Sequence, residues 1–184
     1  MLFRKLAVLT LFGSLLSGCG TSAIQKNDAE GPKSDESVLV VGIKTQPSGP
    51  ELYGMHFLEG SYSGEAVDFG RETAFPVING KGRDGYLVAK AKAGQILVLA
   101  RIFATTKVGK LESYLAYCRA RVMVAEVPKG KVVYLGDIEL AEGDRKLLVR
   151  YGSDLVSAQE HIRTNYPRLN GLEPLPTKFM PTKC

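Results

Sequence analysis

The histidines and carboxylates are the side chains of this sequence whose spacing bears most directly on catalysis and metal binding. His56 and His161 lie more than a hundred residues apart, and neither has cysteine or carboxylate neighbours at the spacing of metal ligands. The chain has no Gly-x-Ser-x-Gly nucleophile motif and no glycine-rich phosphate-binding loop. We therefore expect no metal site and no enzymatic activity, although a carboxylate pair for glycoside hydrolysis stays open. The carboxylates available for it are Asp68, Glu72, Asp84, Asp137, Glu139, Asp144 and Asp154.

Cys19 follows an apolar run that has the features of an export signal. Arg4 and Lys5 form a positive region, Leu6 to Leu16 are mostly apolar, and Ser17-Gly18 are small residues of the kind found before a cleavage site. As a helix the apolar run would rise about 16 Å, which is about half the hydrocarbon thickness of a bilayer. The sequence therefore predicts a signal peptide over residues 1–18 rather than a membrane span.

The run Leu16-Ser17-Gly18-Cys19 resembles the lipobox of bacterial lipoproteins at all four positions. The resemblance implies cleavage before Cys19, a thioether-linked diacylglycerol on its sulfur and a further acyl chain on its new amino group. Two or three acyl chains would anchor the protein firmly, because each buried methylene contributes about 0.8 kcal/mol. In this family an Asp after the lipidated cysteine commonly retains the protein at the inner membrane. Gly20 stands there, so we expect a periplasmic or surface-facing protein on the outer membrane of a two-membrane cell.

The charge of the chain argues against nucleic acid as a partner. Removing residues 1–18 takes away two of the 24 basic residues and none of the 19 acidic ones, which leaves a net charge of about +3. Spread over a whole domain, that excess is far from a nucleic-acid-binding footprint. The expected partners are the membrane, through the lipid anchor, and an envelope protein or polymer.

Composition divides the mature chain into a tether and one domain. Gly20 to Ser37 is rich in small and polar residues, and Ile24 is its only large apolar residue, so the segment is expected to stay flexible. We thus assign residues 19–37 to the lipidated cysteine and its tether. Residues 38–184 are enough for a single domain with its own core, and no second shift in composition suggests another boundary.

The domain is predicted to be a mainly β, antiparallel two-sheet sandwich of about seven strands. A helix over about 154–166 is expected to pack on it, because Asp154 or Ser153 can cap the start and Pro167 ends the pattern. The proline-containing segment after Gly171 is expected to be an extended tail. The strand segments, which are rich in β-branched, aromatic and alternating apolar residues, are Val38–Lys44, Leu52–Leu58, Tyr86–Ala91, Ile96–Phe103, Tyr114–Val127, Val132–Leu140 and Lys146–Tyr151.

A second resemblance covers the middle and end of this domain. The run from Pro128 to Ile138, with a hairpin at Gly94 before it and a helix ending in Asn165-Tyr166-Pro167 after it, resembles uncharacterised bacterial lipoproteins with a transthyretin-like or carboxypeptidase-regulatory-like sandwich. It spans about Tyr86 to Leu169. The resemblance implies a fold and no known catalysis, and a fold alone does not decide function.

Cys118 and Cys184 are the two thiols that remain once Cys19 is acylated. In an oxidising compartment an even pair of this kind can form a disulfide, which here would hold the proline-containing carboxyl end. The register of Cys118 with Ala120 and Val122 suits a buried free thiol equally well. Both readings stay open at this point.

The segment from Leu58 to Gly85 is the candidate binding surface. It combines aromatic rings and arginines with several glycines, which gives contact groups on a pliable loop set against a rigid scaffold. Two further arginines on one strand face could extend it toward an anionic sugar or a carboxylate. The alternative is an ordinary long insertion with partly buried rings and a solvated strand face. The residues are Tyr62, Phe69, Arg71, Phe75, Arg83, Arg119 and Arg121.

These features predict a non-enzymatic, membrane-anchored envelope protein that acts as a binding or scaffolding module. No cofactor is expected beyond the covalent lipid on Cys19. The alternative is an envelope hydrolase, or a carbohydrate-binding module, that acts on peptidoglycan or another glycan. The hydrolase requires two carboxylates about 5 to 10 Å apart in a cleft, and the binding module requires exposed coplanar aromatic rings, for which Tyr62, Phe69 and Tyr86 are the candidates.

Overall fold

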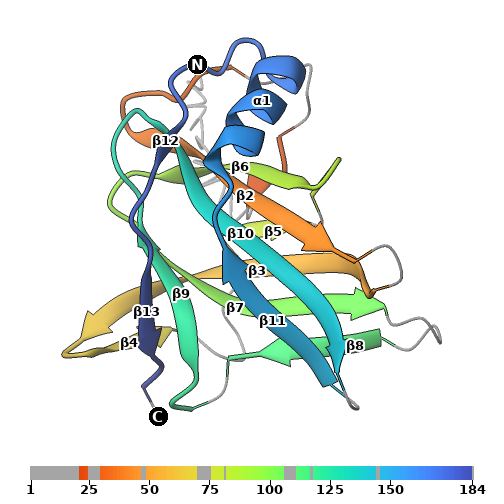
Figure 1. Ribbon diagram of the computed structural model, residues 1–184. Coiled ribbons are helices and arrows are strands. Elements are labelled where there is room, and N and C mark those ends of the chain that lie inside the picture. The colour runs from red at the N-terminus through yellow and green to blue at the C-terminus, as the bar shows by residue number, and fades with distance from the viewer. Residues whose placement is uncertain are drawn as a thin grey trace, which may run out of the picture.

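The computed structural model describes residues 21–24, 30–46, 49–69, 76–80, 82–105, 111–116, 118–143 and 146–183. These residues form two packed β-sheets, with the helix α1 (Leu155–Asn165) on the outer face of the smaller sheet (Figure 1). The mainly β, sandwich-like architecture with one helix in the described residues is therefore confirmed, and α1 lies within the predicted 154–166.

Sheet A, the larger sheet, has eight strands within these ranges, in the order β1-β5-β3-β7-β9-β13, with β4 paired to β3 and β8 to β7. Sheet B has the order β11-β10-β2-β6, with β12 paired to β10. The strands of sheet A are β1 (Thr21–Ser22), β3 (Glu51–Ser63), β4 (Ala66–Phe69), β5 (Ile78–Gly80), β7 (Ile96–Thr105), β8 (Leu111–Leu115), β9 (Arg121–Glu126) and β13 (Lys178–Pro181). Those of sheet B are β2 (Glu36–Thr45), β6 (Tyr86–Lys92), β10 (Val132–Gly143), β11 (Lys146–Gly152) and β12 (Glu173–Pro174).

Each of the seven predicted segments contains a strand, but the pairing is not purely antiparallel. The central strands of sheet B, β2 and β10, run parallel, as do β10 and β12 and the short pair β1 and β5. Parallel strands are usually buried on both faces. The apolar runs Val38–Val41 and Val132–Leu135 meet that condition, because one face of sheet B packs on sheet A and the other on α1.

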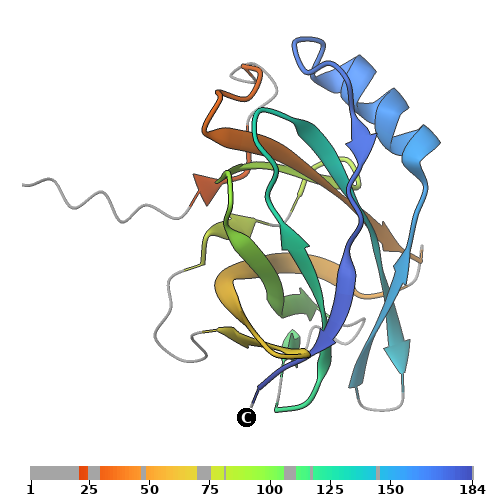
Figure 2. The same ribbon diagram turned by 90° about the vertical axis from the view of Figure 1, so that its left-hand side faces the viewer.

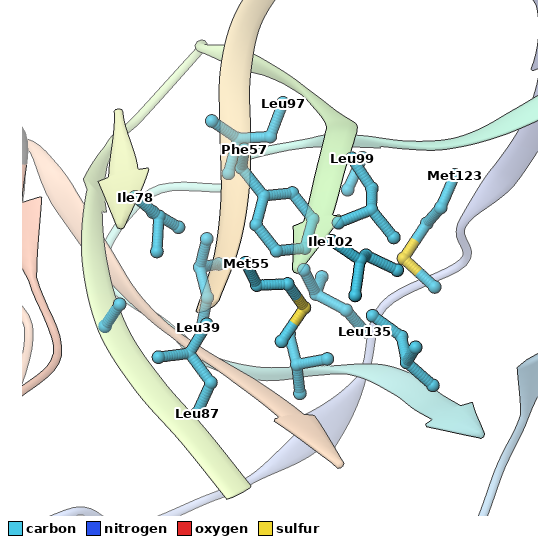
Figure 3. Close-up of a cluster of buried hydrophobic side chains, with 14 of the residues drawn as sticks. Leu39, Met55, Phe57, Ile78, Leu87, Leu97, Leu99, Ile102, Met123 and Leu135 are labelled. Atoms are coloured by element: carbon cyan, nitrogen blue, oxygen red, sulfur yellow. The ribbon is translucent and has the colours of Figure 1, made fainter. Parts of the chain in front are cut away.

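The main core fills the space between the two sheets (Figure 3). Side chains alternate along each strand, so that Phe57 and Leu99 of sheet A point at Leu39 and Leu135 of sheet B. All four are at most 2% exposed. Burial of this apolar surface is the main favourable term that holds the sheets together.

A smaller core, which we call the outer core, lies on the face of sheet A that is turned away from sheet B. Sheet A curls until β4 and the C-terminal segment meet: Thr182 forms a bridge with Val67, and the Lys183 backbone N–H donates to the Val67 carbonyl at 2.9 Å (Figure 2). The predicted irregular tail thus contains β12 and β13, and β13 helps to close the sheet. The outer core consists of Leu58, Val67, Phe69, Val98, Ala100, Val122 and Val124.

Two parts of the predicted tether belong to the fold. Thr21 and Ser22 form β1, and the Ile24 backbone N–H donates to the carbonyl of Val88 in β6 at 2.7 Å. Strand β2 begins at Glu36, and Ser37 is fully buried, with its hydroxyl donating to the Pro128 carbonyl. The domain therefore includes residues before 38. Residues 21–24 pair at open sheet edges, and Glu36 and Ser37 begin the central strand β2. Residues 25–29 lie outside the described part of the chain.

Candidate functional site

The structure separates the predicted binding-surface residues into two regions. Tyr62 on β3 is 39% exposed, and the Lys178 ammonium lies 5.2 Å from the centre of its ring. Phe69 is not a contact residue, because strand β4 turns its ring into the outer core, where it is 8% exposed. Arg71 and Phe75 lie outside the described residues.

Arg119 and Arg121 flank the end of β13 rather than continuing one strand face. The predicted strand Tyr114–Val127 is interrupted by a turn at 118–119, where Arg119 has a φ of +63°. The Arg119 backbone N–H donates to Thr182, and the Arg121 guanidinium donates to the Phe179 carbonyl at 3.1 Å. Arg121 thus helps to hold the C-terminal strand in place.

Arg83 belongs to the second region and sits on a tight hairpin before β6. Its backbone exchanges two hydrogen bonds with Tyr86, of 2.7 and 3.0 Å, across the turn Asp84-Gly85. Both turn residues have positive φ angles, 51° and 80°, as the favoured two-residue hairpin turn requires. The Ile43 backbone N–H donates to the Gly85 carbonyl at 2.7 Å, so the hairpin is tied to β2.

Two hollows share Arg83 in their walls, and together they form the Arg83 site. The larger, of about 540 Å³, opens between this hairpin and the connection from β2 to β3. The smaller, of about 200 Å³, lies beside Ile24 and Tyr166. Gln46, Glu51 and Asp84 add amide and carboxylate groups to the larger hollow. This arrangement offers hydrogen bonds and one guanidinium to a polar partner.

A buried polar cluster, which sequence reasoning missed, joins sheet B to the start of α1. Asp137 on β10 is fully buried, and its carboxylate lies 2.8 Å from the Lys44 ammonium and accepts a hydrogen bond from the Tyr134 hydroxyl. Lys44 also lies 3.3 Å from Asp154, whose backbone N–H donates to the Tyr134 oxygen at 2.9 Å. Asp154 caps the helix by accepting from the Ser157 backbone N–H at 3.1 Å.

A shift in strand register makes this cluster possible. Tyr134 and Asp137 are three residues apart and would point to opposite faces of a regular strand. The pairing of β10 with β2 shifts between these two residues, and Gly136 adopts a φ of +106°. Gly42 on β2 leaves the room, because a Cβ there would lie 1.8 Å from the Asp137 Oδ1.

The contacts in the cluster shift the pKa values of Tyr134, Lys44 and Asp154. Burial raises the pKa of Tyr134, and the hydrogen bond to Asp137 raises it further. The hydrogen bond to Asp137 raises the pKa of Lys44 and outweighs its slight burial. The hydrogen bonds from Ser157 lower the pKa of Asp154. At neutral pH, Tyr134 is therefore neutral, and Lys44 and Asp154 are charged. The Asp137 carboxylate is paired with Lys44 and Tyr134 rather than open to a substrate, which suits a structural role.

The two histidines are packed against aromatic rings. His56 makes an edge contact with Phe103 at 5.1 Å between ring centres, and burial, together with nearby Arg101, lowers its pKa. His161 stacks on Tyr86 at 4.2 Å. Across the described ranges, no group of three His, Cys, Asp or Glu side chains is placed to hold a metal ion. Nor does a helix in those ranges have the length and apolar character to cross a membrane.

Cys118 is disulfide-bonded and lies in the exposed turn before β9. The predicted partner, Cys184, lies outside the described residues, so the pairing itself stays a prediction. The C-terminal strand runs toward Cys118, since Thr182 is hydrogen-bonded to both Arg119 and Ala120. That approach favours Cys184 as the partner, and the alternative of a buried free thiol at Cys118 is wrong because Cys118 is exposed and bonded.

Comparison of the chain with protein-family models, with curated proteins and with solved structures found no match. The two resemblances drawn from the sequence, to lipoproteins and to transthyretin-like sandwiches, therefore stay predictions. The function has to be argued from the residues themselves.

Proposed function

We propose that this protein is a lipid-anchored module of the bacterial cell envelope that binds or scaffolds an envelope protein or polymer without catalysing a reaction. The lipobox-like run Leu16-Ser17-Gly18-Cys19 carries the proposal for the anchor. The hollows on both sides of Arg83 carry the proposal for binding. They set the Arg83 guanidinium on a rigid hairpin, and the larger one adds the Gln46 amide and the Glu51 and Asp84 carboxylates.

The rigidity of the hairpin supports a binding role for the Arg83 site. Gly82 has a φ of +72°, and a Cβ there would lie 2.9 Å from the Tyr86 carbonyl oxygen, so a glycine is required. Because the turn is fixed in this way, Arg83 loses little backbone freedom when a partner binds. A partner with hydroxyl or amide groups, which both donate and accept hydrogen bonds, would complement the guanidinium, the Gln46 amide and the carboxylates of Glu51 and Asp84.

The anchor is tested by labelling cells with a radioactive or alkyne-bearing fatty acid and recovering the tagged protein. We expect label in the protein, recovery in the membrane fraction, and loss of both in Cys19→Ala. An unlabelled protein with an intact N-terminal segment would refute lipidation.

The binding site is tested by crosslinking in living cells, followed by affinity capture and mass spectrometry. Arg83→Glu should abolish recovery of the partner. Lys129→Glu makes the same change of charge at an exposed turn away from the hollows and should leave recovery unchanged. Equal recovery from both variants would exclude the Arg83 site as the contact.

A carbohydrate-binding role is the second candidate, because two tyrosines of β3 are exposed. Tyr53 is 68% and Tyr62 39% exposed, and exposed rings of this kind can stack on sugars. Co-sedimentation with purified peptidoglycan tests this role. Binding that is lost in Tyr53→Ala but kept in Arg83→Glu would favour the glycan over a protein partner. A hydrolase would need an open carboxylate pair, and the pairing of Asp137 and Asp154 with Lys44 does not support one in the buried polar cluster.

A further inference from the structure

We propose that residues 21–24 dock the lipid anchor onto the folded domain, so that the edge made by β1, β5 and the Arg83 hairpin faces the membrane at short range. The partner of this surface is the phospholipid headgroup layer. The inference rests on the proposed lipidation of Cys19. It deepens the proposed function because it places the Arg83 site at the membrane-proximal end of the domain.

The docked segment joins both sheets. Strand β1 pairs in parallel with β5 of sheet A, with Thr21 opposite Ile78 and Ser22 opposite Asn79. Ala23 then packs against the main core. Ile24 follows at the free edge of sheet B, where its backbone N–H donates to the Val88 carbonyl at 2.7 Å.

Side-chain burial supports the same docking. Ile24 is half-buried and packs against the core under α1, next to Tyr86. Ala23 approaches the end of β5, since a Cβ on Gly80 would lie 3.4 Å from the Ala23 Cβ. A segment that was only a spacer would need neither the apolar side chain at Ile24 nor these contacts. Figure 2 shows β1 as the red arrow at the left of the molecule, on the side away from β11.

The docking shortens the reach of the anchor. Thr21 follows Cys19 by two residues, which span at most about 7 Å. A free tether from Cys19 to Ser37 would span about 60 Å when extended. The lipid therefore holds the β1 edge near the bilayer surface, and the domain has a defined orientation instead of a wide range of positions.

The chemistry of this edge suits headgroups. Arg83 is exposed and lines the same hollow as Ala23 and Ile24. A guanidinium within reach of the headgroup layer can pair with lipid phosphates until an envelope partner at the membrane surface replaces them. The short covalent link sets the distance between the domain and the bilayer, and the contact of Arg83 with headgroups helps to fix how the domain is oriented on the membrane.

A pair of insertions tests the docking. One variant carries ten Gly/Ser residues between Gly20 and Thr21, before the docked segment, and the other carries the same ten residues between Asn27 and Asp28, after it. Each insert adds a coil of about 17 Å. The lipidated proteins are reconstituted in phospholipid vesicles that contain acceptor-labelled lipid. A donor dye is attached through an unnatural amino acid at position 156, where the native Val156 is 78% exposed.

We expect energy transfer to fall clearly for the insertion before the segment and to stay at the native level for the insertion after it. An equal fall in both variants would mean that residues 21–24 are not docked and would overturn the proposal. Native-level transfer in both would also overturn it, since the domain would then be held by contacts independent of the anchor.

Ile24→Asp separates docking from lipidation. This change should release the segment, so that the later insertion now lowers energy transfer as well, whereas Ile24→Val should behave as the native protein. Mass spectrometry of the N-terminal peptide establishes the lipid on Cys19 in every variant. A chain without lipid refutes the proposed function, while a lipidated chain that responds equally to both insertions refutes only the docking.

Discussion

The outer face of sheet B and the outer face of sheet A are covered in different ways. Each of these faces is turned away from the main core. On sheet B, α1 covers the face and the buried polar cluster of Tyr134, Asp137 and Lys44 fixes where the helix begins. On sheet A, the sheet curls on itself and aliphatic side chains fill the interior.

The two regions therefore depend on different forces for their stability. Hydrogen bonds and ion pairs in the polar cluster are directional, and they require Tyr134 neutral and Lys44 charged. The outer core depends on apolar area and close packing, which do not change with ionisation. The two regions should therefore respond differently to pH and to substitution of single side chains.

Removal of Asp137 is expected to have the largest effect. Asp137→Ala removes two hydrogen bonds to a buried carboxylate, and each such bond contributes about 1.5–3 kcal/mol. The bond from Lys44 lies at the low end, because Lys44 is 43% exposed and keeps Asp154 as a partner, so we expect a loss of about 3–5 kcal/mol in all. Urea denaturation measures the free energy of unfolding. Glu142→Ala, at an exposed position of the same strand, should change it by less than about 0.5 kcal/mol. A small effect of Asp137→Ala would show that water can replace the cluster.

Truncation in the outer core comes next. Leu58 is 1% exposed, and Leu58→Ala should lower the free energy of unfolding by about 2–5 kcal/mol through lost burial and a cavity. The loss should be the same at neutral and alkaline pH, since no titrating group of the polar cluster is involved. Val156→Ala on the exposed surface of α1 provides the control and should be nearly neutral. A strong pH dependence for Leu58→Ala would contradict the distinction between the two regions.

The sequence carried the signals for the long elements but not for the short ones. The helix was predictable because Asp154 and Pro167 mark its two ends. Strands β12 and β13 contain prolines and polar residues, and they form strands only because β10 and β9 offer open edges. Phe69 was misread for a related reason, since the strand that buries its ring looked like part of a loop.

The polar cluster was beyond sequence reasoning because its members meet only through strand register. Lys44 lies opposite Glu139 across the parallel pairing of β2 and β10, which brings Asp137 near it. One signal was present: an aspartate after Gly136, directly following the apolar run Val132–Leu135. Arg83 was predictable as a loop cation, but Gln46 and Glu51, which share its hollow, come from a different connection.

The third prediction uses alkaline pH to separate the two regions. Tyr134→Phe removes the hydroxyl that donates to Asp137, which should cost about 1.5–3 kcal/mol at neutral pH. In the native protein the pKa of Tyr134 is raised by burial, and that of Lys44 is raised by Asp137. The stability linked to each raised pKa is complete below its unfolded value, about 10, and is lost as the pH rises through the folded value.

The native protein should therefore lose stability above about pH 10, and Tyr134→Phe should lose less over the same interval. Urea denaturation at several alkaline pH values measures both slopes. Tyr53→Phe, at an exposed position, should keep the native slope. If Tyr134→Phe and the native protein lose stability in parallel, the Tyr134 hydroxyl does not carry the alkaline sensitivity.

The smallest expected effect concerns the contact between Lys178 and Tyr62, which joins β13 to β3 beside the outer core. An ammonium over an exposed aromatic ring contributes about 0.5–1 kcal/mol, so Lys178→Gln should lower the free energy of unfolding by no more than that. Lys183→Gln removes the same charge from an exposed position near the same end of the chain and should be close to neutral. A double-mutant cycle with Tyr62→Leu isolates the coupling energy. A coupling energy of zero would mean that the outer core is closed by its aliphatic side chains and the Thr182–Val67 bridge alone. The outer core would then depend on apolar packing and backbone pairing, with no contribution from a charged side chain, in contrast to the polar cluster.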